Sequence, residues 1–211
     1  MDFSRAFTYI FNEPKWVKKI LLTGLISVIP FFGLIYLIGW IAEIAERVRT
    51  NSYLLLPEKF SISYFTEGLK LALTGLIYCV PFFAISMIIR AVDWARVQIF
   101  NGFLENAGSS FWGFLNDAFG FIYFFCFLFI IPCILFIYLE RRNIRDTLQF
   151  KRIYLTIKND YKTFLYLLLA LVLCIIIASF GISVFYIGVI FTIPFGAAIY
   201  SYLVGQTAKS Y

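Results

Sequence analysis

Four long runs without a charged residue most constrain how this chain can fold. Three of them cover residues 20–42, 71–89 and 118–139, and the fourth extends from Thr163 to Ala208. A helix needs about 20 consecutive apolar residues to cross the hydrocarbon core of a bilayer. Each of the first three runs therefore predicts one membrane-spanning helix. The fourth is long enough for two, with serine and glycine residues near its middle.

The composition agrees with a membrane location. Hydrophobic residues make up 62% of the 211 residues, charged residues only 14%, and the mean hydropathy is +0.86. A water-soluble domain of this size could not bury so much apolar surface. The runs also lack the alternation of apolar and polar residues that is typical of membrane β-barrel strands. We therefore expect an all-α fold, a polytopic integral membrane helical bundle with about five transmembrane helices and interfacial amphipathic helices.

The expected elements form a single membrane domain over residues 1–211. In chain order they are an interfacial helix at 1–16, transmembrane helices at 20–46 and 69–92, an interfacial segment at 95–116, a transmembrane helix at 117–140, a basic amphipathic helix at 144–161, and transmembrane helices at 163–181 and 184–207. The first and the basic interfacial helices are predicted from apolar residues spaced three and four apart with polar residues opposite them.

Basic residues gather at the predicted membrane boundaries. The net charge is +6 and the pI is about 9.1, which at these positions favours anionic lipid over nucleic acid as the partner. We expect contact with lipid headgroups from three cations of the basic helix, Lys151, Arg152 and Lys158. With five spans, twelve Lys and Arg residues lie on one face and six on the other. The positive-inside rule then places the 140–162 loop and the C-terminus in the cytoplasm and the N-terminus outside.

Small residues recur at intervals of four in the last predicted helix. Small residues let membrane helices approach closely, so this row predicts a helix-packing ridge, against another helix of the chain or against a partner. Its members are Gly188, Thr192, Gly196, Ala197, Ser201 and Gly205.

Each uncharged run contains proline, and two of the surrounding segments are alike, GLISVIPFF at 24–32 and GLIYCVPFF at 75–83. We expect helix kinks at Pro30, Pro81, Pro132 and Pro194. One interpretation is four kinked packing helices, because neighbouring helices readily satisfy the freed backbone groups. The other is a binding site made of broken helices, as in some transporters.

The residues for most catalytic sites are missing. The chain has no histidine, which excludes Ser-His and Cys-His pairs and the HExxH zinc site. No carboxylate lies inside an uncharged run, so an intramembrane aspartyl pair is not predicted. The four cysteines lie in the predicted spans without a CxxC motif, which favours packing over a metal site or disulfide. We expect no enzyme activity, no cofactor and no metal.

The order of residues along nearly the whole chain is similar to that of a known family. Its features here are an aromatic N-terminal helix followed by Pro14, Lys15, Trp16 and Lys19, then Gly39 and Trp40, Leu56, Pro57 and Glu58, Phe65, Gly68, Leu69 and Lys70, Tyr78 and Pro81, and finally Pro194, Phe195, Tyr200, Gly205 and Gln206. In these the chain resembles the bacterial and archaeal membrane proteins called domain of unknown function 4013. The resemblance implies a fold and no assigned activity.

These observations favour an integral membrane scaffold or accessory subunit that binds membrane lipid and another membrane protein, or a second copy of itself. The alternative is a small transporter or permease component. Because carriers of ions usually place ionisable groups inside the bundle, its substrate would be uncharged or lipid-like.

Overall fold

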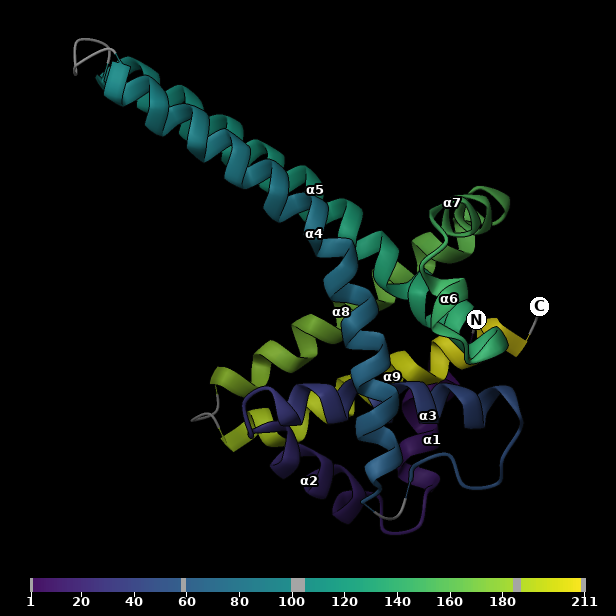
Figure 1. Cartoon of the computed structure of the whole chain (residues 1–211). Coiled ribbons are helices and arrows are strands. Elements are labelled where there is room, and N and C mark those ends of the chain that lie inside the picture. The colour runs from purple at the N-terminus through teal and green to yellow at the C-terminus, as the bar shows by residue number, and fades with distance from the viewer. Residues whose placement is uncertain (1, 58–59, 100–104, 184–186, 210–211) are drawn as a thin grey trace. The chain divides into compact units, whose positions relative to one another are not determined.

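The computed structural model describes residues 2–57, 60–99, 105–183 and 187–209, and this part of the chain is helical, without β-strands. The helices are α1 (Phe3–Asn12), α2 (Trp16–Ser27), α3 (Phe32–Arg49), α4 (Ile62–Ile99), α5 (Glu105–Arg141), α6 (Ile144–Thr147), α7 (Phe150–Asn159), α8 (Tyr161–Ser183) and α9 (Ile187–Lys209) (Figure 1). The predicted all-α membrane fold is confirmed. Four stretches in the described residues are long and apolar enough to cross a membrane, close to the five expected: Ile62–Ala95, Gly113–Glu140, Tyr161–Gly181 and Gly188–Lys209.

The chain divides into two compact units. Unit 1 consists of Met1–Thr74 and Pro132–Tyr211, and unit 2 consists of Gly75–Ile131. Unit 1 therefore contains seven complete helices and one end of each of the two longest, α4 and α5.

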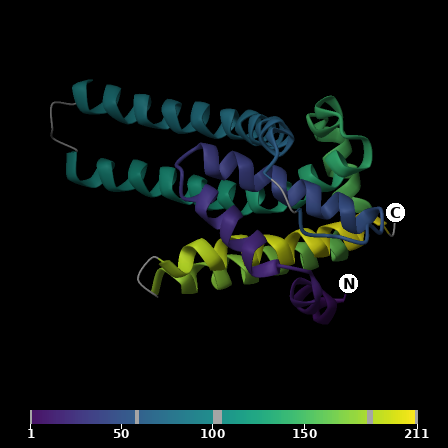
Figure 2. The same ribbon diagram turned by 90° about the horizontal axis from the view of Figure 1, so that it is seen from below.

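The helix expected over 20–46 is divided in two, so the prediction of one continuous span is wrong. Helix α2 ends at Ser27, and after a short turn α3 begins at Phe32 and runs back beside it (Figure 2). Pro30 lies in the turn and has no N–H to continue a helix. Phe31 has a φ of 64°, and the Phe32 N–H donates to the Pro30 carbonyl at 2.8 Å, which makes a γ-turn.

In unit 1, α8 and α9 form an antiparallel hairpin and α3 packs along α9 (Figures 1 and 2). Glycines make the approach close. A side chain at Gly196 would meet the Cys174 carbonyl on α8, and one at Gly205 would overlap the Ala45 carbonyl on α3. Large apolar side chains that are almost fully buried fill the core between the helices, including Trp40, Ile44, Leu167, Leu203 and Val204.

Helix α1 fastens the N-terminus to the C-terminal half of α9. The Asp2 backbone N–H donates to Gln206 Oε1 at 3.0 Å, and the Tyr9 hydroxyl donates to the Ala198 carbonyl at 2.9 Å. The Tyr9 ring stacks on Tyr202 with 4.6 Å between centroids. Burial, with a further contribution from the Glu13 carboxylate, raises the pKa of the Tyr9 phenol well above its usual value. The two ends of the chain therefore lie side by side.

The first part of α4 crosses α3 within unit 1. A side chain at Gly39 would overlap the Tyr64 carbonyl, and one at Gly68 would overlap the Ile35 carbonyl. The two backbones are thus in direct contact at this crossing, as small residues allow in membrane helices.

The basic helix expected over 144–161 is interrupted. It consists of α6 and α7, separated at Leu148 and Gln149, and Tyr161 already belongs to α8. The side chain of Asn143 caps α6 by accepting from the Arg145 N–H.

Unit 2 is a hairpin of the adjoining parts of α4 and α5 held by an aromatic seam. The Tyr123 hydroxyl donates to the Tyr78 carbonyl, and the Phe82 ring stacks on Tyr123 and Phe119 with centroid distances of 4.7 and 5.7 Å. On each helix these partners lie four residues apart, which places them on one side of the helix.

The segment expected at 95–116 and the start of the last expected span differ from the structure or lie outside its described residues. The interfacial segment expected at 95–116 is largely the ends of two long helices, because α4 continues to Ile99 and α5 begins at Glu105. Residues 100–104 lie outside the described residues, as does the expected start of the last span at 184.

Candidate functional site

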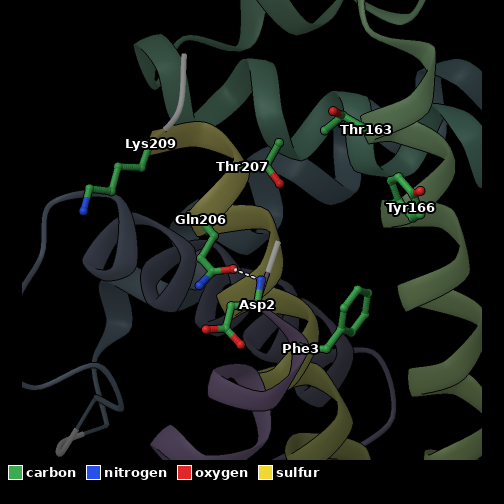
Figure 3. A pocket seen from close by; sticks show the side chains of 7 residues that line it. All are labelled: Asp2, Phe3, Thr163, Tyr166, Gln206, Thr207 and Lys209. Carbon is green, nitrogen blue, oxygen red and sulfur yellow. Dashed lines mark hydrogen bonds between the residues drawn. The ribbon is translucent and has the colours of Figure 1, made fainter.

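A cavity of about 720 Å³, lined by both polar and apolar groups, opens where the two chain ends meet in unit 1 (Figure 3). It is formed by the N-terminus, the first turns of α8 and the last turns of α9, and its lining residues are Asp2, Phe3, Thr163, Tyr166, Gln206, Thr207 and Lys209.

The charged groups around this cavity already have partners. Arg5 holds the Asp2 carboxylate, with Nε 3.2 Å from Oδ2 and the backbone N–H 3.1 Å from Oδ1. Lys209 points away from the cavity, and its Nζ donates to Asn51 Oδ1 at 2.7 Å (Figure 3). Two lining hydroxyls are engaged as well, because Thr163 donates to Asp160 Oδ2 at 2.6 Å and Thr207 donates to the Leu203 carbonyl at 2.9 Å. The lining residues form no pair of nucleophile and base.

A second polar cluster lies where α3, α4 and α5 meet in unit 1. Glu43 accepts from Arg47 Nε at 2.8 Å and lies 3.8 Å from Arg142 Nη2, and Glu67 accepts from Lys70 Nζ at 2.9 Å. The Tyr138 hydroxyl and Glu67 Oε2 are buried without a hydrogen-bond partner among the described residues.

The space between these helices is small. It measures about 10 Å³ and is lined by Gly39, Ala42, Glu43, Glu67, Tyr138, Leu139 and Arg142. That volume suits about one water molecule, which needs polar partners of this kind. The sequence did not predict the cluster, because its charged members lie just beyond the ends of the uncharged runs. Their charge alone indicated only a membrane boundary.

A third cluster is a buried ion pair that the sequence also did not predict. Lys19 Nζ lies 2.9 Å from Glu13 Oε2 and 3.0 Å from the Leu56 carbonyl, and both charged side chains are at least 94% buried. Glu13 Oε1 also accepts from the backbone N–H groups of Leu55 and Leu56. The pair ties the base of α2 to the loop after α3. Its oxygens and ammonium group are engaged within the protein, so its role is structural.

The structure places the predicted packing ridge inside unit 1. Gly188 lies against Gly181 of α8, and the Thr192 hydroxyl donates to the Ala178 carbonyl at 3.0 Å. Gly196 faces Cys174 of α8, and Gly205 faces α3. Ser201 is fully buried and bonds to the carbonyl of the half-buried Ala197 at 2.6 Å. The ridge thus divides between two neighbouring helices of the same chain.

The four prolines differ in their surroundings. Pro30 lies in the break between α2 and α3, whereas Pro81, Pro132 and Pro194 lie inside α4, α5 and α9. None of the four prolines lines either of the two cavities described above.

The three cations predicted to contact lipid headgroups also differ. Lys151 and Lys158 are exposed on α7, beside the exposed Tyr154 and Leu155. Arg152 points inward, with Nη2 2.7 Å from Glu140 Oε2 and Nη1 3.4 Å from Asp146 Oδ1. The headgroup prediction therefore depends on the two lysines.

Unit 2 exposes an apolar surface next to its aromatic seam. We call this surface the outer face of α4, and it carries exposed large side chains at Leu76, Val80, Phe83, Met87, Ile88 and Trp94. Only 11% of the most hydrophobic stretch of α4 is buried. Its counterpart on α5 exposes Phe114, Phe121, Ile122, Phe124 and Phe125.

Potential metal ligands do not gather in the described part of the chain, where no group of three His, Cys, Asp or Glu side chains is found. Its four cysteines, Cys79, Cys126, Cys133 and Cys174, are not joined in disulfides.

The chain matches the sequence model of a known family. The model of the family described as protein of unknown function (DUF4013) matches residues 22–191, from the middle of α2 into the second turn of α9. No curated protein and no solved structure matches the chain.

Proposed function

Because the chain belongs to the family of proteins of unknown function DUF4013, whose name assigns no activity, we propose its function from its own geometry. It is an integral membrane scaffold or accessory subunit that binds another membrane protein or lipid and catalyses no reaction. We place it in the cytoplasmic membrane. The observation that carries the proposal is the uncovered outer face of α4.

This face combines features that favour a protein partner. Apolar side chains alone give little reason for helices to associate in lipid, whereas small residues allow close backbone contact. Ala84 and Ala91 lie two turns apart on the exposed side, with the exposed Ile88 between them. Arg90 is also exposed and belongs to a stretch otherwise suited to the membrane. A cation there is costly unless it reaches a headgroup or an acidic or carbonyl group of a partner.

The experiment is site-specific photo-crosslinking in native membranes. A photoreactive amino acid replaces Met87 or Ile88 on the outer face, and Phe82 in the seam serves as the matched control on the same helix. We expect the outer positions to form one discrete adduct with another polypeptide and the seam position to link only within the chain. Arg90→Gln should lower the yield of the adduct.

Adducts with lipid alone would contradict the role as a protein scaffold. Uptake of an uncharged or lipid-like substrate by the purified protein in liposomes would favour the alternative, a small transporter.

A further inference from the structure

We propose that α2 and α3 form a re-entrant hairpin, which inserts its turn among the acyl chains of the bilayer and returns to the same face without crossing. Its partner is the hydrocarbon of the membrane.

The turn of this hairpin is apolar and uncovered by the chain. Phe31 is 79% exposed, and the neighbouring large apolar residues of the turn and its flanks are also exposed: Leu25, Val28, Ile29, Phe32 and Leu34. No charged residue lies between Lys19 and Glu43. An exposed apolar cluster of this size indicates an interaction surface, and the lack of any charge suits hydrocarbon.

The backbone of the turn also suits this environment. Non-helical backbone at membrane depth must satisfy its hydrogen bonds internally. Four N–H groups around the turn donate to carbonyls of the same hairpin, those of Val28, Ile29, Phe32 and Gly33. Pro30 has no N–H to satisfy. The hydroxyls of Thr23 and Ser27 donate to carbonyls one helical turn earlier, at 3.1 and 2.7 Å.

The length of α2 argues against a crossing by this helix. At 1.5 Å per residue, α2 with 12 residues is only about 18 Å long, whereas the hydrocarbon core is about 30 Å thick. Gly24 packs against Ile190 near the start of α9, whereas Ala45 and Val48 pack against Gly205 near its end, so α3 runs from the turn toward the C-terminal end of α9. Helix α8 of the same unit also exposes large apolar side chains, at Leu169, Leu173, Ile176 and Phe180.

The distribution of charge agrees with this topology. If only the four apolar stretches cross, sixteen of the 18 Lys and Arg residues lie on one face, and only Arg90 and Arg96 lie on the other. The single-span interpretation of 20–46 divides them far less sharply, twelve to six. The rule that cations stay in the cytoplasm is therefore satisfied better by the re-entrant hairpin.

Both chain ends then lie on one face, as the contact between Asp2 and Gln206 requires. The expectation of an N-terminus outside and a C-terminus inside is replaced by both in the cytoplasm.

The test uses single cysteines in a full-length variant without its native cysteines. Lys18→Cys and Ser52→Cys mark the two bases of the hairpin, since both positions are exposed, and Val28→Cys marks the turn. In inside-out vesicles, an impermeant thiol reagent should label both bases, and in intact cells it should label neither. The turn cysteine should resist the reagent from both sides. A fluorophore attached to it before reconstitution should be quenched by lipids spin-labelled in their acyl chains.

Labelling of the two bases from opposite faces would overturn the proposal, because the segment would then cross once. Labelling of the turn by the aqueous reagent from either face would overturn it as well. Protection without quenching by lipid would show that protein, such as a second copy of the chain, covers the turn, which also contradicts the proposal.

Discussion

Two stretches of this chain are nearly the same in sequence and differ in structure. Residues 19–33 read KILLTGLISVIPFFG and residues 70–84 read KLALTGLIYCVPFFA. Both begin alike, as the hydroxyls of Thr23 and Thr74 donate to the carbonyls of Lys19 and Lys70 at 3.1 and 3.0 Å. The first stretch then ends α2 and turns back, whereas the second continues within α4.

The proline does not explain why only the first stretch turns back, because both stretches contain it. The explanation lies three positions after the proline, where the first stretch has Gly33 and the second has Ala84. A side chain at Gly33 would overlap the backbone of Ile26 and Ser27, so the turn closes only around a glycine. Ala84 occupies the equivalent position in the middle of a helix. A proline therefore permits a break in a membrane helix, and the residues around it decide whether the break forms.

The largest difference in stability is expected when the two equivalent lysines, Lys19 and Lys70, are each replaced by methionine. Lys19 is buried in its pair with Glu13, whereas Lys70 is 42% exposed in its pair with Glu67. Lys19→Met leaves a buried carboxylate unpaired and should lower the free energy of unfolding by about 3 to 5 kcal/mol. Lys70→Met should lower it by only about 1 kcal/mol or less. Chemical unfolding in detergent measures the change in the free energy of unfolding for both variants. Equal losses would show that the buried Glu13–Lys19 pair does not stabilise the start of α2 more than an exposed pair would.

The next largest change in stability is expected from replacing the equivalent glycines, Gly24 and Gly75, by alanine. A methyl group at Gly24 would overlap the Ile190 carbonyl of α9, so Gly24→Ala should destabilise the protein by about 1 to 3 kcal/mol. Nothing lies within 4 Å of a methyl group at Gly75, so Gly75→Ala should stabilise α4 by about 0.5 to 1 kcal/mol. Thermal unfolding of the two variants should therefore shift in opposite directions. A gain in stability from Gly24→Ala would mean that the contact between α2 and α9 is not as close as described, and a loss from Gly75→Ala would mean that the surroundings of Gly75 are not open.

The turn itself is tested by a third pair. Gly33→Ala should cost about 1 to 3 kcal/mol, because its methyl group would collide with backbone that has no room to move. The reverse change, Ala84→Gly, should cost about 0.5 to 1 kcal/mol through helix propensity alone. Cysteine labelling at Lys18 and Ser52 adds a second readout for Gly33→Ala. Opening of the hairpin into one span would move these bases to opposite faces, whereas Ala84→Gly should leave them where they are.

The elements that the sequence predicted well depend on local composition. An uncharged apolar run must form a helix in lipid whatever its neighbours, which is why α4, α5, α8 and α9 were expected close to where they lie. The break at Pro30 was not predicted, because 24–32 and 75–83 look alike and the deciding residue, Gly33, follows the motif. Its role depends on backbone folded back beside it.

The candidate sites were harder to predict for a related reason. The pair of Glu13 and Lys19 joins residues whose charges, read along the chain, indicate only a membrane boundary. Its burial depends on the loop at Leu55 and Leu56, 42 and 43 residues beyond Glu13. Arg152 likewise has the spacing of a headgroup contact, but its partner Glu140 lies on another helix. Tertiary contacts of this range leave no periodicity in the sequence.

The smallest change in stability is expected when the equivalent aromatic residues, Phe31 and Phe82, are each replaced by glycine. Phe31 is exposed and holds a φ of 64°, which costs a residue with a side chain about 1 to 2 kcal/mol. Glycine adopts this angle freely but loses about 0.5 to 1 kcal/mol more entropy on folding, so Phe31→Gly should raise stability in detergent by at most about 1 kcal/mol.

The same change at Phe82 should act in the opposite direction. Phe82→Gly removes one ring, with its stacking contacts to Phe119 and Tyr123, and places glycine inside a helix, and each of these two changes costs about 1 kcal/mol. Reconstitution into lipid nanodiscs tests whether the Phe31 ring contacts lipid. If the turn at Phe31 inserts among acyl chains, loss of the ring forfeits about 0.3 to 0.6 kcal/mol of insertion energy, and the gain seen in detergent should shrink in lipid. A gain of the same size in both media would mean that lipid does not contact the Phe31 ring.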